Sequence, residues 1–486
     1  MSSEQKNIFG TDGVRDVCAS GFDGKGWLAP AGLDRLAQGM VRFLERARRD
    51  GRITADPPRV LIGRDPRLSG PAIERVLTTS LERHGIVVRH GGILPTPAVS
   101  VLVEEGEAEL GIVISASHNP PEFNGVKWFG PDGAKLTVEE EERVSADVLA
   151  AKPHPALVPL DPNPSAGATD DEAAALRARY LDRLLVHFGG SATPEGSEES
   201  RPLAGMRIVL DCARGATAIC AVEAYERAGA EVHAIHATPD GERINLGCGS
   251  THPEAISGAV LARGADLGIA FDGDGDRAIL VDETGAVVDG DEMLTLWALD
   301  LHRRGALPHD KIAVTVMSNA GMESYLGEQG ISLVRTPVGD REVHQAMLRE
   351  GLVLGGEQSG HIIRAGSATG DGIRTGLSLA SLVRRSGKPL SELRSAIPRY
   401  PQTLLGVTVR RKPALSTLPE VATIVSDAER ALAGHGRVLL RYSGTEPLAR
   451  VLVEGADAEE NDLWAERIAD VLRDHPSLHE AITSES

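Results

Sequence analysis

Short runs of aliphatic and β-branched residues alternate along this chain with longer stretches that have helical periodicity. Residues 59–63 predict a buried strand, and residues 71–84, which have a proline in the first turn, predict a helix. Two further apolar runs, 86–90 and 110–114, predict the next strands. Strands that alternate with helices are typical of βαβ units, so we expect an α/β fold in this part of the chain.

The same alternation recurs twice further along the chain. Strands expected at 207–211 and 231–236 flank a helix near 216–228. A third run begins with a strand at 266–271 and continues through a strand at 312–316. Three similar α/β runs indicate an internal structural repeat.

Segments rich in proline, glycine and serine mark the expected domain boundaries. Residues 152–168 contain several prolines, which exclude a helix, and therefore predict a linker. Residues 189–200 are rich in glycine and serine and predict an exposed insertion. A second linker is expected at 386–400.

The end of the chain has a different pattern. Three strands are expected at 404–409, 437–441 and 449–454, with two helices, which is typical of an α+β module. We therefore predict an α/β fold with three similar mixed-sheet α/β domains and a C-terminal α+β domain. The predicted domain bounds are 1–152, 169–264, 265–386 and 400–486.

Composition and charge narrow the function classes. The 486 residues are 41% hydrophobic and 25% charged, as in soluble globular proteins, and the net charge of −19 disfavours a nucleic-acid partner or an anionic membrane surface. No apolar run approaches the roughly 18 residues of a membrane span, and residues 1–6 are followed by no apolar signal region. The four cysteines form no C-x-x-C pair, so their spacing indicates neither a zinc site nor a redox motif, and reduced cytosolic thiols are expected.

A serine follows one of the predicted strands at a sharp turn. Ser117 stands beside His118 at the end of the apolar run 110–114, and Asn119-Pro120 forces a turn there. The hydroxyl is therefore expected at the tip of a strand, where it can act as a nucleophile. A capping serine would explain the segment equally well if it were taken alone.

Three carboxylates follow another apolar run at alternate positions. Asp272, Asp274 and Asp276 are hard oxygen ligands suited to Mg²⁺. A calcium loop of the EF-hand type is the alternative, with Glu283 at its twelfth position, but Arg277 stands where that loop needs glycine. Because a serine that carries a phosphoryl group needs a cation to neutralise it, the two motifs together indicate a phosphoserine enzyme that moves phosphoryl groups.

Six blocks in order resemble the α-D-phosphohexomutase family, and 63–67 is similar to a further family block with a supporting role near the active site. The six blocks are Phe9-Gly-Thr-Asp-Gly-Val-Arg15, Ser115-Ala-Ser-His-Asn-Pro120, Asn124-Gly-Val-Lys127, Asp272-Gly-Asp-Gly-Asp-Arg277, Gly356-Glu-Gln-Ser-Gly-His361 and Arg441-Tyr-Ser-Gly-Thr-Glu-Pro447. The resemblance implies four domains around a central cleft. Gln358 and the segment 243–249 favour the branch that acts on glucosamine phosphates, whereas Asp16 and Tyr442 depart from the family pattern.

The resemblance also implies roles for individual residues. Ser117 carries the phosphoryl group and ligates Mg²⁺ together with Asp272, Asp274 and Asp276. The expected catalytic residues are Ser117, His118, Lys127, Arg15 and Arg277, with Lys127 as the general acid/base. The expected substrate-binding residues are Glu357, Ser359, His361, Arg341, Arg441, Ser443, Gly444, Thr445 and Arg450.

The implied reaction interconverts glucosamine 6-phosphate and glucosamine 1-phosphate through a sugar 1,6-bisphosphate that also acts as activator, and it feeds amino-sugar nucleotide and cell-wall synthesis. An acidic protein repels such a substrate, so the cations in these motifs must reverse the field locally. The expected partner is a hexosamine phosphate in the cytoplasm, and a homodimer is the candidate assembly. Two alternatives stay open, a mutase of the same fold acting on mannose or glucose phosphates and a non-catalytic phosphosugar- or calcium-binding protein.

Overall fold

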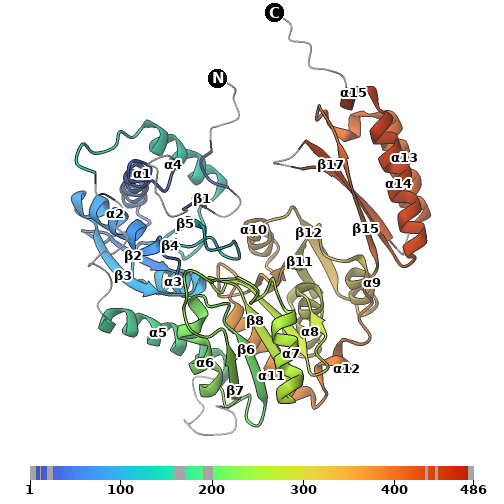
Figure 1. Cartoon of the computed structure of the whole chain (residues 1–486), viewed down its shortest axis with the longest axis horizontal. Helices are drawn as coiled ribbons and strands as arrows, with labels where there is room; N and C mark the ends of the chain where they lie inside the picture. The colour runs from blue at the N-terminus through green and yellow to red at the C-terminus, as the bar shows by residue number, and fades with distance from the viewer. Residues whose placement is uncertain are drawn as a thin grey trace, which may run out of the picture.

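A computed structural model gives the fold of the chain, shown from blue at the N-terminus to red at the C-terminus in Figure 1. The structure describes residues 7–10, 13–18, 26–157, 159, 170–189, 201–432, 436–443 and 447–479. Most of the predicted linker 152–168 and of the predicted insertion 189–200 lies outside the described residues.

The first domain is built on a five-stranded sheet in the order β1-β5-β4-β2-β3. β2, β3 and β4 run parallel, whereas β5 is antiparallel to β4 and to β1. Alternate residues of β4 point to opposite faces, so Leu110, Ile112 and Ile114 join the core under α1, α2 and α4, and Val113 joins the core under α3. The elements are β1 (Val14–Val17), α1 (Pro30–Arg49), β2 (Arg59–Arg64), α2 (Gly70–Arg83), β3 (Val87–Ile93), α3 (Thr96–Glu104), β4 (Leu110–Ile114), β5 (Phe123–Phe129) and α4 (Val138–Ala150).

The second domain has a five-stranded sheet in the order β10-β9-β8-β6-β7. β6 pairs in parallel with β7 and β8, and β9 is antiparallel to β8. Helix α5 (Asp170–Gly189) precedes this sheet and packs against α3 and β3 of the first domain. The other elements are β6 (Arg207–Asp211), the 3₁₀ turn η2 (Ala216–Ile219), α6 (Ala221–Arg227), β7 (Glu231–Ile235), α7 (Glu254–Arg263), β8 (Leu267–Phe271), β9 (Ala278–Asp282) and β10 (Val287–Val288).

The structure differs from the predicted boundary between the second and third domains. A boundary at 264/265 would cut this sheet, because β8 is hydrogen-bonded to β6 over its length and β9 and β10 extend the same sheet. The acidic segment 272–276 therefore belongs to the second domain. The third domain begins near residue 289.

The third domain has a four-stranded sheet in the order β12-β11-β13-β14. β11 is parallel to β12 and β13, and β14 is antiparallel to β13. The predicted linker 386–400 contains a short helix, α12. The elements are α8 (Gly290–Arg303), the 3₁₀ turn η3 (Pro308–Asp310), β11 (Lys311–Thr315), α9 (Ala320–Glu328), β12 (Ser332–Thr336), α10 (Asp340–Glu350), β13 (Leu354–Gly356), β14 (Ile362–Arg364), α11 (Gly372–Ser386) and α12 (Leu390–Arg394).

The three sheets share one topology, which confirms the structural repeat that the sequence indicates. Four strands in the orders β3-β2-β4-β5, β7-β6-β8-β9 and β12-β11-β13-β14 have the same connections and directions. In each repeat the last two strands form an antiparallel pair joined by a short loop. Those three loops are therefore equivalent positions of the fold.

The C-terminal domain is an antiparallel sheet, β15-β17-β16, covered by α13 and α14, and it lies apart from the first domain at the right of Figure 1. Its sheet contacts α9 of the third domain. The expected α+β module is thus confirmed. Its elements are β15 (Gln402–Thr408), the 3₁₀ turn η4 (Leu415–Thr417), α13 (Pro419–Ala431), β16 (Gly436–Tyr442), β17 (Leu448–Gly455), α14 (Ala458–Asp474) and α15 (Pro476–His479). Among the helices of the described residues, none combines the length and apolarity that crossing a membrane requires.

A buried carboxyl group at the start of α8 predicts how the stability of the third domain depends on pH. Burial, together with the charge of Asp289, raises the pKa of Asp291 to about 7, and its side chain is only 3% exposed. Since this value exceeds the roughly 3.9 of an unfolded aspartate, the unfolded state releases the proton first, and stability falls as the pH rises from about 4 to about 7.

Asp291→Asn removes this titration while its amide oxygen can still accept from the backbone N–H of Asn319. We expect the variant to melt close to the native protein at pH 5 and several degrees above it at pH 8.5, because the native protein then carries a buried charge. Thermal unfolding at the two pH values measures this. The exposed Glu328→Gln serves as the control, and an equal melting difference at both pH values would contradict the assignment.

Candidate active site

The three predicted motifs occupy the same position in the three structural repeats. The Ser117 segment joins β4 to β5, the acidic segment 272–276 joins β8 to β9, and the segment 357–361 joins β13 to β14. Each loop follows the carboxyl end of a strand that runs parallel to its neighbour. Ligands of open α/β sheets bind at this edge, so one topological rule places all three loops at one site.

Ser117 occupies a strained turn just beyond β4. Its φ is +53°, a region that non-glycine residues rarely adopt, and its side chain is buried. The Oγ donates to Oδ2 of Asp272 at 2.7 Å and lies 3.4 Å from Nδ1 of His118. The first and second domains therefore meet at this hydroxyl.

The three carboxylates of the acidic segment lie together in the interior. Each offers an oxygen, and these oxygens lie within 4.8 Å of one another. Burial and the charges of Asp276 and Asp274 raise the pKa of Asp272 well above its usual range. Burial acts in the same direction on Asp276, but Lys127 and His361 outweigh it and hold its pKa below the usual range. Lys127 Nζ donates to Asp274 Oδ2 at 2.8 Å and to Asp276 Oδ2 at 3.3 Å.

The same cluster retains unused acceptors. Oδ1 of Asp274 and Oδ1 of Asp276 are buried and have no hydrogen-bond partner. Thr96, at the start of α3, donates its hydroxyl to Oδ2 of Asp274 at 2.6 Å. A buried, acceptor-rich and negatively charged cluster of this kind has the donor set that a hard divalent cation requires.

Arg67 fixes the Ser117 turn from beneath. Its guanidinium is fully buried and donates to the carbonyl oxygens of Ser117, Asn119 and Phe123 at 2.9, 2.8 and 2.9 Å. Nε of Arg67 donates to the buried Asp65 at 2.9 Å, which neutralises the guanidinium. The planar fork can satisfy several carbonyls at once because its donors have a fixed geometry.

A side chain of the second domain binds the same turn. Asn245 Nδ2 donates to the carbonyl oxygens of Ser117 and Asn119 at 2.9 and 3.1 Å. Sequence reasoning did not identify Asn245, although it noted the segment 243–249. Nothing in the local pattern of that segment shows which distant loop its side chain reaches.

A cavity of about 810 Å³ opens in front of these groups, between the first and third domains. Arg15, Arg277 and Lys135 bring positive charge to its wall, where the carboxylates of Asp276, Asp340 and Glu357 also lie. Burial, with the nearby charges of Arg277 and Arg15, lowers the pKa of His118 to about 4, so this imidazole is neutral at pH 7. The lining residues are Ile8, Phe9, Gly10, Gly13, Arg15, His118, Lys135, Asp276, Arg277, Thr315, Met317, Val338, Gly339, Asp340, Glu357, Gln358, Ser359 and His361.

Comparison with known proteins decides the family. Models of the three α/β/α domains and of the C-terminal domain of phosphoglucomutase/phosphomannomutase match residues 6–154, 193–285, 289–400 and 404–471. The chain belongs to this family. The expectation of a phosphohexomutase, and hence of an enzyme, is confirmed, and the matched ranges agree with a third domain that begins near 289.

Curated relatives extend the match over nearly the whole chain. The phosphoglucosamine mutase of Moorella thermoacetica is 44% identical over 93% of this chain and 96% of its own length. That of Symbiobacterium thermophilum is 44% identical over 96% of this chain and 98% of its own length, and that of Streptomyces griseus is 43% identical over the same shares.

Solved structures show the same fold. A phosphoglucomutase/phosphomannomutase family protein from Burkholderia thailandensis has a TM-score of 0.72 at 21% identity, with 96% of this chain and 97% of that chain covered. The open form of the Paramecium phosphoglucomutase pp63/parafusin has a TM-score of 0.71 at 16% identity, with 97% and 95% covered. The family fold of three α/β domains and a C-terminal domain is therefore present in this chain.

Several predicted residues of the phosphohexomutase site lie together in the cavity wall. Glu357 accepts from the backbone N–H of Gly339 at 3.3 Å, and Ser359 is exposed at the loop tip. His361 is buried with Nδ1 3.7 Å from Asp276, and its Nε2 accepts from the backbone N–H of Gly370 at 2.9 Å. The loop 357–361 and the acidic segment 272–276 are thus in direct contact.

Other predicted residues lie elsewhere. Arg341, on α10, forms a two-fold ion pair with the buried Glu141 of α4 and is not among the described residues of the cavity wall. Arg441 and Arg450 face each other across β16 and β17 in the C-terminal domain. Ser443 follows β16, where its carbonyl accepts from Lys412 at 2.6 Å.

Two predicted residues of the C-terminal loop, Gly444 and Thr445, lie outside the described residues. The geometry does not support the EF-hand alternative. Glu283 accepts hydrogen bonds from Ser391 and does not join the three aspartates. The acidic segment therefore lacks the twelfth-position ligand of a calcium loop.

The contacts of Asn245 predict that it positions Ser117. Asn245→Gly removes both hydrogen bonds, and glycine tolerates the positive φ of +62° at this position. We expect mutase kcat to fall by roughly tenfold or more if Ser117 carries the reaction, because a displaced turn would misalign its oxygen. Steady-state kinetics of the variant and of the exposed neighbour Leu246→Ala test this, and equal kcat values in both variants would contradict it.

Proposed function

We propose that this enzyme interconverts glucosamine 6-phosphate and glucosamine 1-phosphate, with Ser117 as the phosphoryl carrier. The observation that carries the proposal is the Ser117 hydroxyl, which donates a hydrogen bond to a buried carboxylate of a three-aspartate cluster, and Asp276 of that cluster lines the cavity. Curated relatives named phosphoglucosamine mutase, at 41–44% identity, support the choice of sugar.

Mg²⁺ is the cofactor that we assign to this cluster. The fit rests on one buried oxygen each of Asp274 and Asp276 that accepts no hydrogen bond, and Asp272, Asp274, Asp276 and the Ser117 oxygen would hold the ion. When bound, it supplies positive charge for the phosphoryl oxygens. Lys127 also contacts two of the three carboxylates and contributes positive charge there.

The chemistry that we propose is a transfer in two directions. The free hydroxyl of the sugar attacks the phosphorus of phosphorylated Ser117, so that the new P–O bond forms as the P–Oγ bond breaks and the hydroxyl proton passes to a base. The sugar 1,6-bisphosphate then turns within the cavity, and its other phosphoryl group returns to Ser117 with the opposite proton transfer. Positioning and charge neutralisation carry most of such a reaction.

Lys127 and His118 are proposed to have different roles in this transfer. Lys127, which we propose as the general acid/base, is buried against the acidic segment. His118 is neutral at pH 7 and lies 3.4 Å from the Ser117 oxygen, so it can orient that oxygen by hydrogen bonding. Arg277 and Arg15, both in the cavity wall, are proposed to bind phosphoryl oxygens.

The sugar and its second phosphate are assigned to two further surfaces. Glu357, Ser359 and His361 offer acceptors and donors for sugar hydroxyls at the cavity wall. Arg441, Ser443 and Arg450, with Gly444 and Thr445, are proposed to hold the non-reacting phosphate after the C-terminal domain moves over the cavity. Arg341 forms an ion pair with Glu141 that joins the first and third domains. We therefore propose that Arg341 supports substrate binding indirectly, by holding the two walls of the cavity together.

The biological setting follows from the reaction. The product supplies amino-sugar nucleotides for cell-wall synthesis, and four free cysteines support a cytoplasmic location. A homodimer is the assembly that we propose for the chain.

Ser117→Ala tests the carrier. We expect mutase turnover to fall to background with a melting temperature close to that of the native protein, because the change removes one oxygen from a turn held by other groups. Intact mass of the native protein should show one phosphoryl group, absent from Ser117→Ala. The exposed Ser359 provides the comparison, since Ser359→Ala should keep the phosphoryl group, and retained turnover in Ser117→Ala would refute the mechanism.

The choice of sugar is tested by kinetics on three substrates. The hydroxyls read by Glu357 and Ser359 are common to several hexoses, so selectivity must come from the 2-amino group. A single hydrogen-bonded difference of about 1–3 kcal/mol corresponds to roughly a ten- to hundredfold preference in kcat/KM for glucosamine phosphate over glucose phosphate. A preference for glucose or mannose phosphate would assign the chain to another branch of the family.

A further inference from the structure

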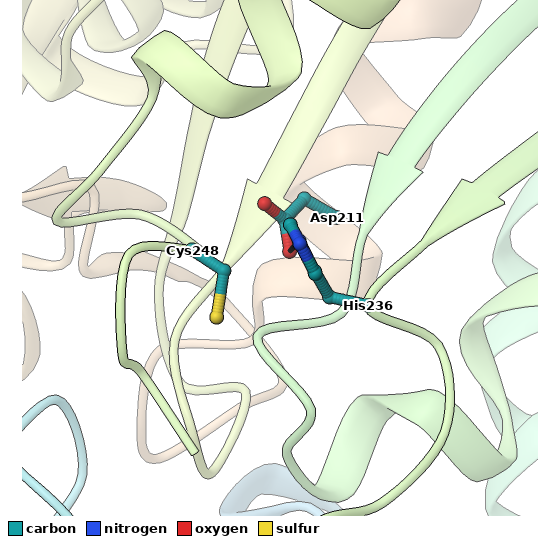
Figure 2. Close-up of side chains that lie close together, drawn as sticks. All are labelled: Asp211, His236 and Cys248. Carbon is teal, nitrogen blue, oxygen red and sulfur yellow. Dashed lines mark ion pairs between the residues drawn. The ribbon is translucent and has the colours of Figure 1, made fainter. Parts of the chain in front are cut away.

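A second cluster of metal-ligating side chains lies in the second domain, apart from the aspartates of the active site. Asp211 ends β6, His236 directly follows β7, and Cys248 lies in the loop after it (Figure 2). One ligand atom from each lies within 4.8 Å of the other two. Figure 2 shows that the three side chains come from separate segments and converge at the carboxyl edge of this sheet.

Asp211 is a buried charge whose partner differs from that of its counterpart in the first domain. Asp65 and Asp211 both stand at the end of the first strand of their repeat, and each accepts the backbone N–H of the residue two positions on. Asp65 is neutralised by the guanidinium of Arg67 at 2.9 Å. The corresponding residue in the second domain is Ala213, so Asp211 faces His236 Nδ1 at 3.1 Å instead.

The other two side chains are held toward Asp211. His236 Nδ1 is buried and lies 3.1 Å from Oδ1 of Asp211 without making a hydrogen bond, and the residue has a φ of +48°, a region that non-glycine residues uncommonly adopt. Cys248 is fully buried, and its sulfur accepts from Arg214 at 3.2 Å. A buried imidazole nitrogen that lies beside a carboxylate and a sulfur without a hydrogen bond is an arrangement that a bound metal ion would complete.

We propose that Asp211, His236 and Cys248 bind a divalent transition-metal ion of the zinc class. Carboxylate, imidazole and thiolate are the ligands that zinc takes in proteins, whereas Mg²⁺ disfavours sulfur. The backbone N–H groups of Ala213 and Gly249 donate to Asp211, and Arg214 donates to the sulfur, as supporting groups do around metal ligands. His236 is 23% exposed, which leaves a solvent-facing side for a fourth ligand.

Cysteine spacing alone cannot indicate a site of this kind. The chain has no local zinc motif because the three ligands lie in segments that are brought together only when the sheet forms. The proposed metal site is also connected to the Ser117 turn and to the acidic segment 272–276. The loop with Cys248 carries Asn245, which binds the Ser117 turn, and Ala216 donates its backbone N–H to Gly273 of the acidic segment at 2.8 Å. The bound ion therefore has a structural role, holding both loops.

Cobalt is the probe that separates the two metal sites. The full-length protein is stripped of metal, saturated with Mg²⁺ to fill the aspartate cluster, and titrated with Co²⁺. We expect one equivalent to produce the near-ultraviolet sulfur-to-cobalt charge-transfer band that signals a thiolate ligand. Cys248→Ser should abolish the band, and His236→Ala should weaken Co²⁺ binding by at least roughly tenfold. Cys18→Ser, a change at a cysteine of the first domain, is the matched control and should keep the native band.

A second measurement covers the case in which Cys248→Ser does not fold. Zn²⁺ should raise the melting temperature of the native protein and of Cys18→Ser in the presence of excess Mg²⁺, but not that of His236→Ala, which lacks the imidazole ligand. The proposal is overturned if the native protein shows no thiolate band, if the band survives in Cys248→Ser, or if Zn²⁺ stabilises His236→Ala as much as the native protein.

Discussion

Repulsion among three buried carboxylates is the constraint on which the active site depends. Asp272, Asp274 and Asp276 would separate or become solvated if their backbone were free. Backbone hydrogen bonds from three directions prevent this. Thr96 of the first domain donates to the Asp274 carbonyl, Ala216 of the second to that of Gly273, and Gly372 of the third to that of Gly275, at 2.8, 2.8 and 3.0 Å. The segment is thus held by all three α/β domains.

Charge compensation also joins the domains around the cavity. Lys135 of the first domain pairs with Asp340 of the third at 2.5 Å, and Arg341 pairs with Glu141 next to it. These pairs are largely buried, so they are screened by solvent less than surface pairs and resist separation of the two cavity walls. Lys135 and Arg341 are thereby each neutralised by a carboxylate of the facing domain.

Local pattern and motif spacing predicted the strands and the three loops, because strand periodicity and turn residues act over a few positions. The sheet to which each strand belongs was harder to predict from the sequence. The strand 267–271 was assigned to a new domain because it begins an apolar run, whereas its hydrogen bonds to β6 span a long stretch of chain. The 216–228 helix forms as a 3₁₀ turn and a shorter helix. Arg67 and Asn245 act through contacts with carbonyl oxygens in distant loops. The periodicity of hydrophobic and polar residues cannot predict such contacts.

The attachment of the C-terminal domain has a consequence for building hybrid enzymes. Arg437 of β16 donates to the carbonyl oxygens of Val316 and Ser318 at 2.7 Å each, and these residues flank Met317 of the cavity wall. Asn319 in turn exchanges hydrogen bonds with the backbone of Tyr400. Because these acceptors are main-chain carbonyls, a chimera that exchanges the domain at residue 400 keeps them whatever side chains stand at 316 and 318. An incoming C-terminal domain must therefore carry an arginine at the position of Arg437 to dock in the same way.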